Sequence, residues 1–310
     1  MKTAFLFSGQ GDQTAGMMRD ICENSPAART IFVTADAVLG RGISALCFEG
    51  PQEALNLTHN TQPCLLTAEL AAFAALAERG IHPDAAAGFS LGEYAALTAA
   101  GVMTTEDALR IIQIRADAMQ EACPVGRGAM AAILKQDAAA VQALCDETEG
   151  YVVPVNYNCP GQIVVSGEAG AVEQVCSLAK SRKIRAVRLS VSVPSHCALM
   201  APAAERLREA FRSIAFREAG FPCYSDVDAA PYRPGGDTAE QLCRQVQSPV
   251  LWEQLLRNMR RDGFDCFVEI GPGTTLSQFV RKCFPEDGDV RILNVRDWES
   301  LEKTETELRG

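Results

Sequence analysis

The sequence predicts an α/β fold in which a small subdomain interrupts a domain built on a parallel sheet. Short apolar segments alternate with helical periodicity on both flanks of the chain, which is typical of parallel sheets. The middle instead has the order strand, helix, two strands, helix and strand, which is the ferredoxin-like unit. The chain has 310 residues, which is enough to bury a large core. Hydrophobic residues make up 47% and charged residues 22%, as is usual for globular proteins.

Elements of the parallel-sheet domain are expected on both flanks. Strands are expected where a short apolar run ends in a turn, and helices where apolar residues recur every three or four positions. The predicted elements are strands over 3–8 and 85–88, helices over 61–79, 91–100 and 106–123, a helix from about 201, and strands over 266–270 and 291–295.

The ferredoxin-like subdomain is expected over residues 125–191, so that the parallel-sheet domain consists of residues 1–124 and 192–310. A cleft between two such bodies is a common place for a ligand. The predicted elements of the subdomain are a strand over 128–134, a helix over 137–145, strands over 152–157 and 163–166, a helix over 169–181 and a strand over 185–189.

Composition excludes several classes of protein. The net charge of −10 argues against a nucleic-acid binder, because neutralising phosphates needs surplus Lys and Arg. The first apolar run is too short for a signal peptide, and no segment approaches the roughly 20 apolar residues of a membrane span, so we expect a cytoplasmic protein without membrane contact. The 12 cysteines are scattered without a CxxC pair and are expected to be reduced thiols.

One short stretch is basic, although the chain as a whole has a negative net charge. Two interpretations are open: a solvated helix end with an edge strand, or a local site for an anionic partner. Within nine residues it contains Lys180, Arg182, Lys183, Arg185 and Arg188.

The segment GFSLG at residues 88–92 fits G-x-S-x-G, follows a short apolar strand and opens a helix, as a nucleophile elbow does. Two glycines let the chain turn sharply and present the hydroxyl of Ser90 beneath the start of the helix. The pattern is also found in ordinary strand-to-helix turns, which is the alternative.

A serine nucleophile needs a base, and histidine is the usual one because its pKa lies near neutrality. His59 lies in a polar loop and His82 precedes a proline at a helix exit, so both are expected at the surface. His196 is the candidate by elimination. Its neighbour Cys197 is expected to pack in the core, because adjacent side chains seldom face each other.

Arg115 lies on the apolar face of its predicted helix, within about 60° of Ala108, Ile111 and Met119 at 100° per residue. A charge there needs a partner. Either it forms a structural ion pair, or it binds the carboxylate of a substrate.

The glycine-rich loop at residues 9–13 does not fit a dinucleotide site, because position 14 is Thr rather than Gly. Its backbone N–H groups can instead face an oxyanion.

Together these segments strongly resemble the malonyl-CoA:acyl carrier protein transacylase family, which is related to the acyltransferase domains of polyketide synthases. The resemblance runs nearly end to end. It rests on FSGQGDQ (7–13), TQP (61–63), GFSLGEYAAL (88–97), Arg115 with MQEA (119–122), NYNCPGQIVVSG (156–167), SVPSHCALM (192–200), residues 245–249 and EIGPG (269–273).

The resemblance implies a hydrolase-like α/β domain and transfer of a malonyl group from malonyl-CoA to an acyl carrier protein, without a metal or other cofactor. The implied nucleophile is Ser90, its base His196, and the carbonyl that orients the base that of Gln245, with no acidic third member. The protein is expected to be a monomer. The other implied site residues are Gln10 and Leu91 for the oxyanion, Arg115, Met119 and Asn156 for the substrate, and Lys180, Arg182, Lys183 and Arg185 for the carrier or coenzyme A.

Two positions depart from the family pattern: Phe89 stands where many members have His, and Asp12 where many have Ser. Neither belongs to the implied catalytic set. The alternatives are a serine thioesterase or esterase, which could use the same elbow, and a docking module without catalysis. The sequence also leaves open whether the carrier belongs to fatty acid or polyketide synthesis.

Overall fold

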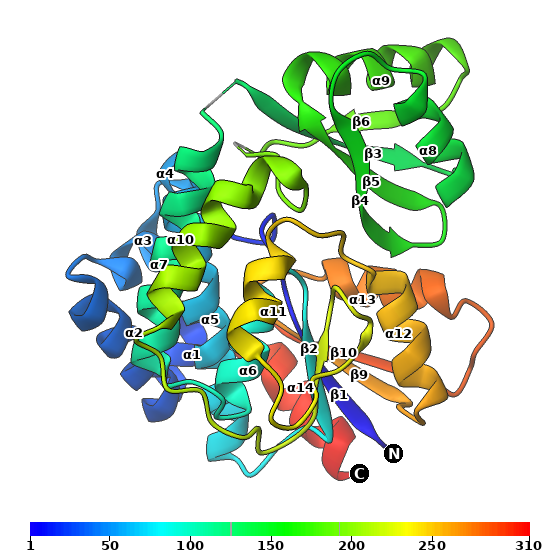
Figure 1. Ribbon diagram of the computed structural model, residues 1–310. Helices are drawn as coiled ribbons and strands as arrows, with labels where there is room; N and C mark the ends of the chain where they lie inside the picture. Colours follow the sequence, from blue (N-terminus) through cyan, green and yellow to red (C-terminus); the bar gives the residue numbers. More distant parts are fainter. Residues whose placement is uncertain (125, 192) are drawn as a thin grey trace.

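The computed structural model describes residues 1–124, 126–191 and 193–310, and these residues form two separate sheets (Figure 1). In the larger sheet of the described residues the order is β10-β9-β1-β2-β7-β8; all neighbours are parallel except β7 and β8. This confirms the predicted α/β class and adds an antiparallel edge. The strands are β1 (Thr3–Phe7), β2 (Ala85–Gly88), β7 (Cys223–Ser225), β8 (Ala230–Pro231), β9 (Cys266–Ile270) and β10 (Arg291–Val295).

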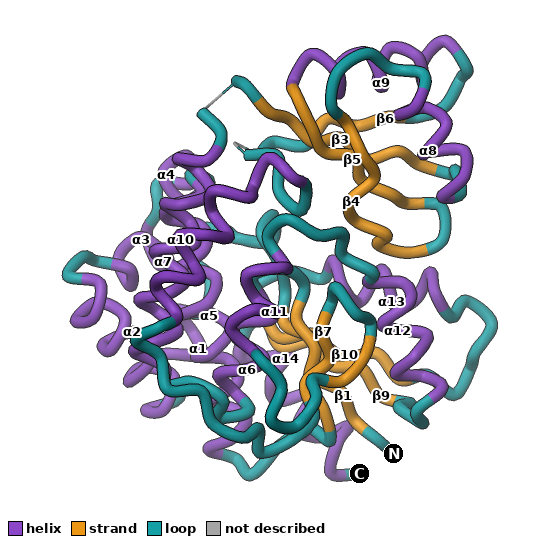
Figure 2. Tube along the Cα trace, viewed as in Figure 1, coloured by secondary structure: helices purple, strands orange, loops and turns teal. Residues whose placement is uncertain are grey.

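Helices cover both faces of this sheet, as the tube in Figure 2 shows. In the central strand β1, Phe5 and Phe7 join one apolar cluster, while Ala4 and Leu6 join the cluster on the opposite face. Burial on both faces explains why β1 is apolar throughout rather than alternating. The helices of the domain are α1 (Arg19–Asn24), α2 (Pro26–Leu39), α3 (Ile43–Glu49), α4 (Gln52–Leu55), α5 (Thr58–Glu78), α6 (Gly92–Ala99), α7 (Thr105–Ala122), η1 (Ala198–Met200), α10 (Ala201–Phe211), α11 (Thr238–Gln245), α12 (Trp252–Arg261), α13 (Thr275–Cys283) and α14 (Trp298–Arg309).

The smaller sheet is antiparallel, with the order β4-β5-β3-β6, and lies at the top of Figure 1. Ala131 and Ile133 of β3 pack with the helices on one face, whereas Met130 and Ala132 belong to a second cluster on the other. The predicted division at 125–191 stays a prediction, and residues 125 and 192 lie outside the described residues. The elements are β3 (Gly128–Leu134), α8 (Ala138–Asp146), β4 (Val152–Cys159), β5 (Gln162–Glu168), α9 (Ala169–Ser181) and β6 (Ala186–Arg188).

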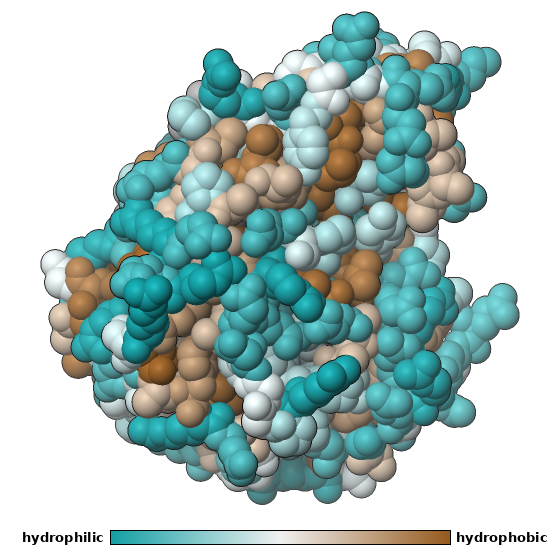
Figure 3. Space-filling model, viewed as in Figure 1, coloured by the Kyte–Doolittle hydropathy of each residue, from teal (hydrophilic) through white to brown (hydrophobic). Residues whose placement is uncertain are grey.

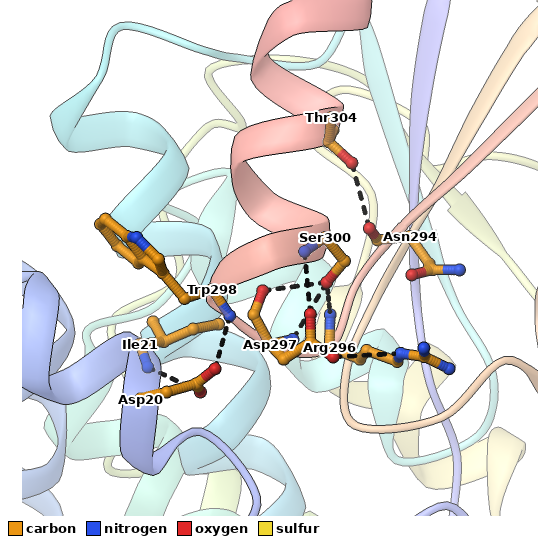
Figure 4. Close-up of polar contacts among 8 residues, drawn as sticks. All are labelled: Asp20, Ile21, Asn294, Arg296, Asp297, Trp298, Ser300 and Thr304. Carbon is orange, nitrogen blue, oxygen red and sulfur yellow. Dashed lines mark hydrogen bonds and ion pairs between the residues drawn. The ribbon is translucent and has the colours of Figure 1, made fainter.

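The last helix, α14, is hydrogen-bonded to the first, α1 (Figure 4). Asp297 caps α14 by accepting from the N–H of Ser300 over 2.8 Å, and the Ser300 hydroxyl accepts from the N–H of Asp297 over 3.0 Å. The carboxylate of Asp20 in α1 accepts from the N–H of Trp298 over 2.7 Å. These bonds satisfy N–H groups that a helix start leaves free.

Among the described residues, no helix is both long enough and apolar enough to cross a membrane.

Candidate active site

A pocket lies between the two sheets. Figure 3 shows brown, apolar surface in the hollow between the upper and lower parts of the molecule. The walls come from the loop after β1, the turn after β2, α7, the start of α13 and the face of the small sheet that carries no helices. Its lining includes Gln10, Asp12, Phe89, Ser90, Leu91, Arg115, Met119, Met130, Ala132, Asn156, Asn158, His196 and Phe279.

Ser90 occupies a sharp turn between β2 and α6. Its φ is 56°, in the left-handed region that side chains rarely adopt. Both flanking glycines are sterically required: a Cβ on Gly88 would lie 1.9 Å from the carbonyl carbon of Gly92, and one on Gly92 would lie 2.4 Å from the oxygen of Phe7. The segment therefore has the geometry of a nucleophile elbow rather than of an ordinary turn.

His196 lies directly beside this serine. Its Nε2 is 2.8 Å from the Ser90 Oγ, and its Nδ1 is 2.9 Å from the backbone oxygen of Gln245. Because a carbonyl oxygen can only accept, Nδ1 carries the proton and Nε2 is free to accept from the hydroxyl. His196 also has a positive φ, 63°, and its N–H donates to the oxygen of Val246 over 2.9 Å.

The imidazole of His196 is held neutral. Burial, and then the positive charge of Arg115, lower its pKa to about 4, although its hydrogen bond to Gln245 opposes the shift. A neutral ring can accept a proton throughout the neutral pH range.

The guanidinium of Arg115 reaches into the same site, and this residue is only 1% exposed. It donates to Gln62 Oε1 over 2.7 Å, to Ser90 Oγ over 3.0 Å and to Gln245 Oε1 over 3.3 Å, while its buried Nε has no partner. Within the described ranges, no carboxylate oxygen lies within 4.0 Å of it. The structural ion pair considered from the sequence is therefore not found there, and a planar donor group is left facing the pocket beside Ser90.

Two backbone N–H groups face the same pocket. Gln10 and Leu91 both line it, and in the part of the chain that the structure describes neither N–H donates to a protein acceptor. The side chain of Gln10 donates to Thr58 Oγ1 over 3.2 Å, which holds its loop. Free N–H groups beside a serine hydroxyl are what a negatively charged carbonyl oxygen requires.

The two predicted substrate residues are buried in the wall of this pocket. Met119 of α7 is 2% exposed, and its sulfur accepts from Gln62 Nε2 over 3.5 Å. Asn156 of β4 is 4% exposed and pairs through its backbone with Val250. The pocket thus brings both together with Ser90.

The basic stretch lies elsewhere. None of Lys180, Arg182, Lys183 and Arg185 lines the pocket; they are at the outer end of α9 and in the turn before β6. Arg182 is ion-paired with Glu147. These residues follow the helix that packs on the face of the small sheet opposite the pocket.

The other two histidines and Cys197 lie outside the set of contacts around Ser90. His82 is exposed, His59 is half-buried, and neither lines the pocket. Cys197 is buried, its thiol donates to the oxygen of Pro194 over 3.2 Å, and burial raises its pKa.

Four polar residues of the site were missed from the sequence. Gln62 holds Arg115 and Met119, and Asn158 lines the pocket with a buried, unpartnered Oδ1. Glu93 and Asp226 lie beneath the elbow, both fully buried. In the sequence, a polar residue within an apolar helix is a signal that could have identified Gln62. No local pattern marks Asp226.

The chain is similar to several known proteins. The family model described as "Acyl transferase domain" matches residues 4–302. A malonyl CoA-acyl carrier protein transacylase of Bacillus subtilis (strain 168) is 44% identical over 305 residues, which are 97% of this chain and 95% of the relative. A crystal structure of a malonyl CoA-acyl carrier protein transacylase from Clostridium perfringens is similar with a TM-score of 0.94 at 38% identity, covering 100% of this chain and 98% of the other.

A second solved structure, of a type II PKS acyl-carrier protein in complex with its malonyl-transacylase, matches with a TM-score of 0.95 at 37% identity over 99% of this chain and 100% of the other. Fold and site thus define an α/β acyltransferase with a serine elbow. The chain belongs to the malonyl CoA-acyl carrier protein transacylase family.

Proposed function

We propose that this protein transfers a malonyl group from malonyl-CoA to the phosphopantetheine thiol of an acyl carrier protein, through a malonyl ester on Ser90. The observation that carries the proposal is the convergence of Ser90, His196 and Arg115 in one pocket. The names of the relatives support the same donor and acceptor.

In the first half-reaction, Nε2 of His196 takes the proton of the Ser90 hydroxyl as Oγ attacks the thioester carbonyl. The N–H groups of Gln10 and Leu91 hold the oxyanion, and coenzyme A leaves as a thiol after His196 returns the proton. In the second half-reaction, the carrier thiol gives its proton to His196 and attacks the ester, which releases Ser90. The order of events is ping-pong.

Arg115 supplies selectivity for an acyl group with a free carboxylate. Its N–H groups donate to neutral oxygens of Gln62, Ser90 and Gln245. A malonyl carboxylate can replace them with a charge-assisted, two-point contact, which a neutral acyl group cannot. Met119 and Asn156 form the wall beside it.

The carrier and coenzyme A are anionic partners, and the positive charges of Lys180, Lys183 and Arg185 provide local attraction on an otherwise acidic protein. Because these residues lie outside the pocket, they act on approach and docking rather than on the acyl group. The relative bound to its carrier protein supports direct contact with a carrier.

We place the protein in the cytoplasm, as a monomer. All 12 cysteines are free, and eleven of them are buried, which is typical of a reducing compartment.

The test is mass spectrometry of the native protein after mixing with malonyl-CoA. One malonyl group on Ser90, absent in Ser90→Ala, is expected. An adduct on Cys197, or none, would refute the mechanism.

Steady hydrolysis of the adduct by water, without transfer to a carrier thiol, would instead indicate a thioesterase. Transfer to carriers of fatty acid synthesis and of polyketide synthesis, measured side by side, decides between those two pathways.

A further inference from the structure

Two buried carboxyl groups face each other directly beneath the serine elbow. Glu93 lies in the first turn of α6, and Asp226 follows β7; both are fully buried. Each side chain lies within hydrogen-bonding reach of the other, and burial raises the pKa of both groups. Two ionised carboxylates in that position would repel each other and neither could donate, which favours one proton held by the pair.

The surrounding donors show which group holds that proton. Glu93 accepts from the N–H of Asp226 over 3.1 Å, from Gln245 Nε2 over 3.0 Å, and from the hydroxyl of Tyr232. Donors therefore satisfy both oxygens of Glu93, as an ionised carboxylate requires.

Asp226 is surrounded differently. Its Oδ2 accepts from the N–H of Ser90 over 2.7 Å, but its Oδ1 is buried and has no donor among the described residues. An ionised oxygen left in that position would be costly, whereas a protonated one can donate to Glu93. Burial and the charge of Glu93 raise the pKa of Asp226 well above its usual range, which agrees with this assignment.

One cation faces the pair from across the site. The positive charge of Arg115 acts on Asp226, and the side chain of Gln245 links Arg115 to Glu93: its Oε1 accepts from Arg115 and its Nε2 donates to Glu93. Of the other titratable groups among the described residues, the phenol of Tyr232 donates to Glu93, and Tyr94 and Cys223 interact with Glu93 electrostatically. The negative charge of Glu93 can therefore offset the positive charge of Arg115 without a direct hydrogen bond to the guanidinium N–H groups.

We propose that Asp226 is a positioning residue that keeps its proton in the working enzyme: Oδ2 holds the N–H of Ser90, and the protonated Oδ1 donates to Glu93, the sole charged member of the pair. This inference rests on the proposed function of Ser90.

The location of the proton matters for the reaction. Ser90 is held in its left-handed conformation from both sides, by Asp226 at its N–H and by Gln245 Nε2 at its carbonyl oxygen over 2.8 Å. Negative charge develops beside Ser90 when the thioester is attacked. A neutral Asp226 keeps the carboxyl that contacts the Ser90 N–H from opposing it, while the charge stays on Glu93, which makes no such contact with that N–H.

The test compares isosteric variants at the two positions. An asparagine at position 226 can accept from Ser90 and donate to the carboxylate of Glu93, which reproduces a protonated acid. A glutamine at position 93 replaces one carboxylate oxygen by an N–H₂ group, which meets a donor already in place: Tyr232 at Oε1, or the N–H groups of Asp226 and Gln245 at Oε2. The proposal therefore predicts opposite results from two chemically equal changes.

The rate of malonyl-Ser90 formation and the melting temperature are measured for native protein, Asp226→Asn, Asp226→Ala and Glu93→Gln. Asp226→Asn should keep at least about a third of the native rate and the native melting temperature, because it restores both bonds that alanine removes. Asp226→Ala and Glu93→Gln should each lose about 30-fold or more.

Loss of more than tenfold in Asp226→Asn, or a native rate in Glu93→Gln, would overturn the assignment. Asp226→Asn decides even where Glu93→Gln does not fold. Failure of the native protein to form the adduct would refute the proposed function instead, so the two failures are distinguishable.

Discussion

The guanidinium of Arg115 donates to the hydroxyl of Ser90: Nη2 lies 3.0 Å from Oγ. The group proposed to bind the acyl carboxylate thus contacts the proposed nucleophile directly. Because the hydroxyl accepts from Arg115, its own proton is free to point to Nε2 of His196, 2.8 Å away. Under the proposed function, this contact would couple substrate selection to activation of the serine.

Arg115→Ala should lower malonyl transfer by about 30-fold to a few thousandfold, the equivalent of roughly 2–5 kcal/mol for a desolvated charge pair. Acetyl transfer should fall much less, since no carboxylate is lost. The measurement is the ratio of kcat/KM for malonyl-CoA and acetyl-CoA. Arg110→Ala is the control on the same helix, because Arg110 is exposed and paired with Asp107. An unchanged ratio in Arg115→Ala would exclude carboxylate recognition.

The rate of serine acylation should be nearly independent of pH between 8 and 5.5. His196 is neutral there because burial lowers its pKa to about 4, and kcat/KM should fall only as pH approaches that value. The sequence alone suggested a fall near neutrality, the usual range for histidine. Circular dichroism at each pH separates protonation from unfolding. A midpoint near 6.5 with intact fold would mean that His196 is not the base, or not buried as described.

Asp12→Asn should stabilise the protein, and more at pH 8 than at pH 4. Burial, and then the charge of Glu269, raise the pKa of Asp12 to about 6, although the hydroxyl of Thr275, 2.6 Å from its Oδ1, opposes the shift. The folded state therefore binds the proton more tightly than the unfolded chain, so the contribution of Asp12 is favourable below about pH 4 and is lost as pH rises through 6.

The gain at pH 8 should be on the order of 2–3 kcal/mol, read from urea unfolding at both pH values. Asparagine keeps the acceptor for Thr275. Glu149→Gln, which removes an exposed carboxylate, is the control and should show no such dependence on pH. Equal stabilisation by Asp12→Asn at both pH values would contradict the assignment of a partly buried carboxyl that titrates near pH 6.

Reversal of charge in the basic stretch should weaken the encounter with anionic partners. Lys183→Glu with Arg185→Glu should raise the apparent KM for the carrier or for malonyl-CoA and flatten its dependence on salt, while kcat stays the same. The control is the same reversal at Lys303 and Arg309 of α14, which lies at the end of the molecule opposite α9 (Figure 1). Unchanged kinetics with both substrates would make the stretch an ordinary solvated surface.

Much of the fold could be predicted from the sequence, because the elements concerned are long or strongly patterned. The strands near both ends and all six elements of the small subdomain lie where periodicity put them, within a few residues. Residues 19–55 form four helices that were not predicted, and three of them, of seven residues or fewer, are too short for a periodic pattern. The longer α2 was missed although Ser25, Pro26 and Gly40 mark its ends. Strand β7 is only Cys223–Ser225, stabilised by its neighbour β2 rather than by its own pattern.

The residues of the site also divide into those that the sequence indicates and those that it does not. Ser90, His196 and Arg115 could be found because each has an unusual local context: an elbow, a lone candidate base, a charge on an apolar face. Asp226 could not, because nothing near it in the chain indicates that its carboxyl meets Ser90, 136 positions away. Contacts of that kind depend on how β7 is placed beside β2.

Ser90 and His196 share one backbone property, a positive φ near 60°. Glycine adopts that conformation without strain, so glycine at position 90 would relax the chain while removing the hydroxyl proposed as nucleophile. At position 196 it would also leave a cavity and remove the hydrogen bond to the oxygen of Gln245, which opposes the gain. Selection of heat-resistant variants by folding alone would therefore favour glycine at position 90, and would need turnover as a second criterion in every round.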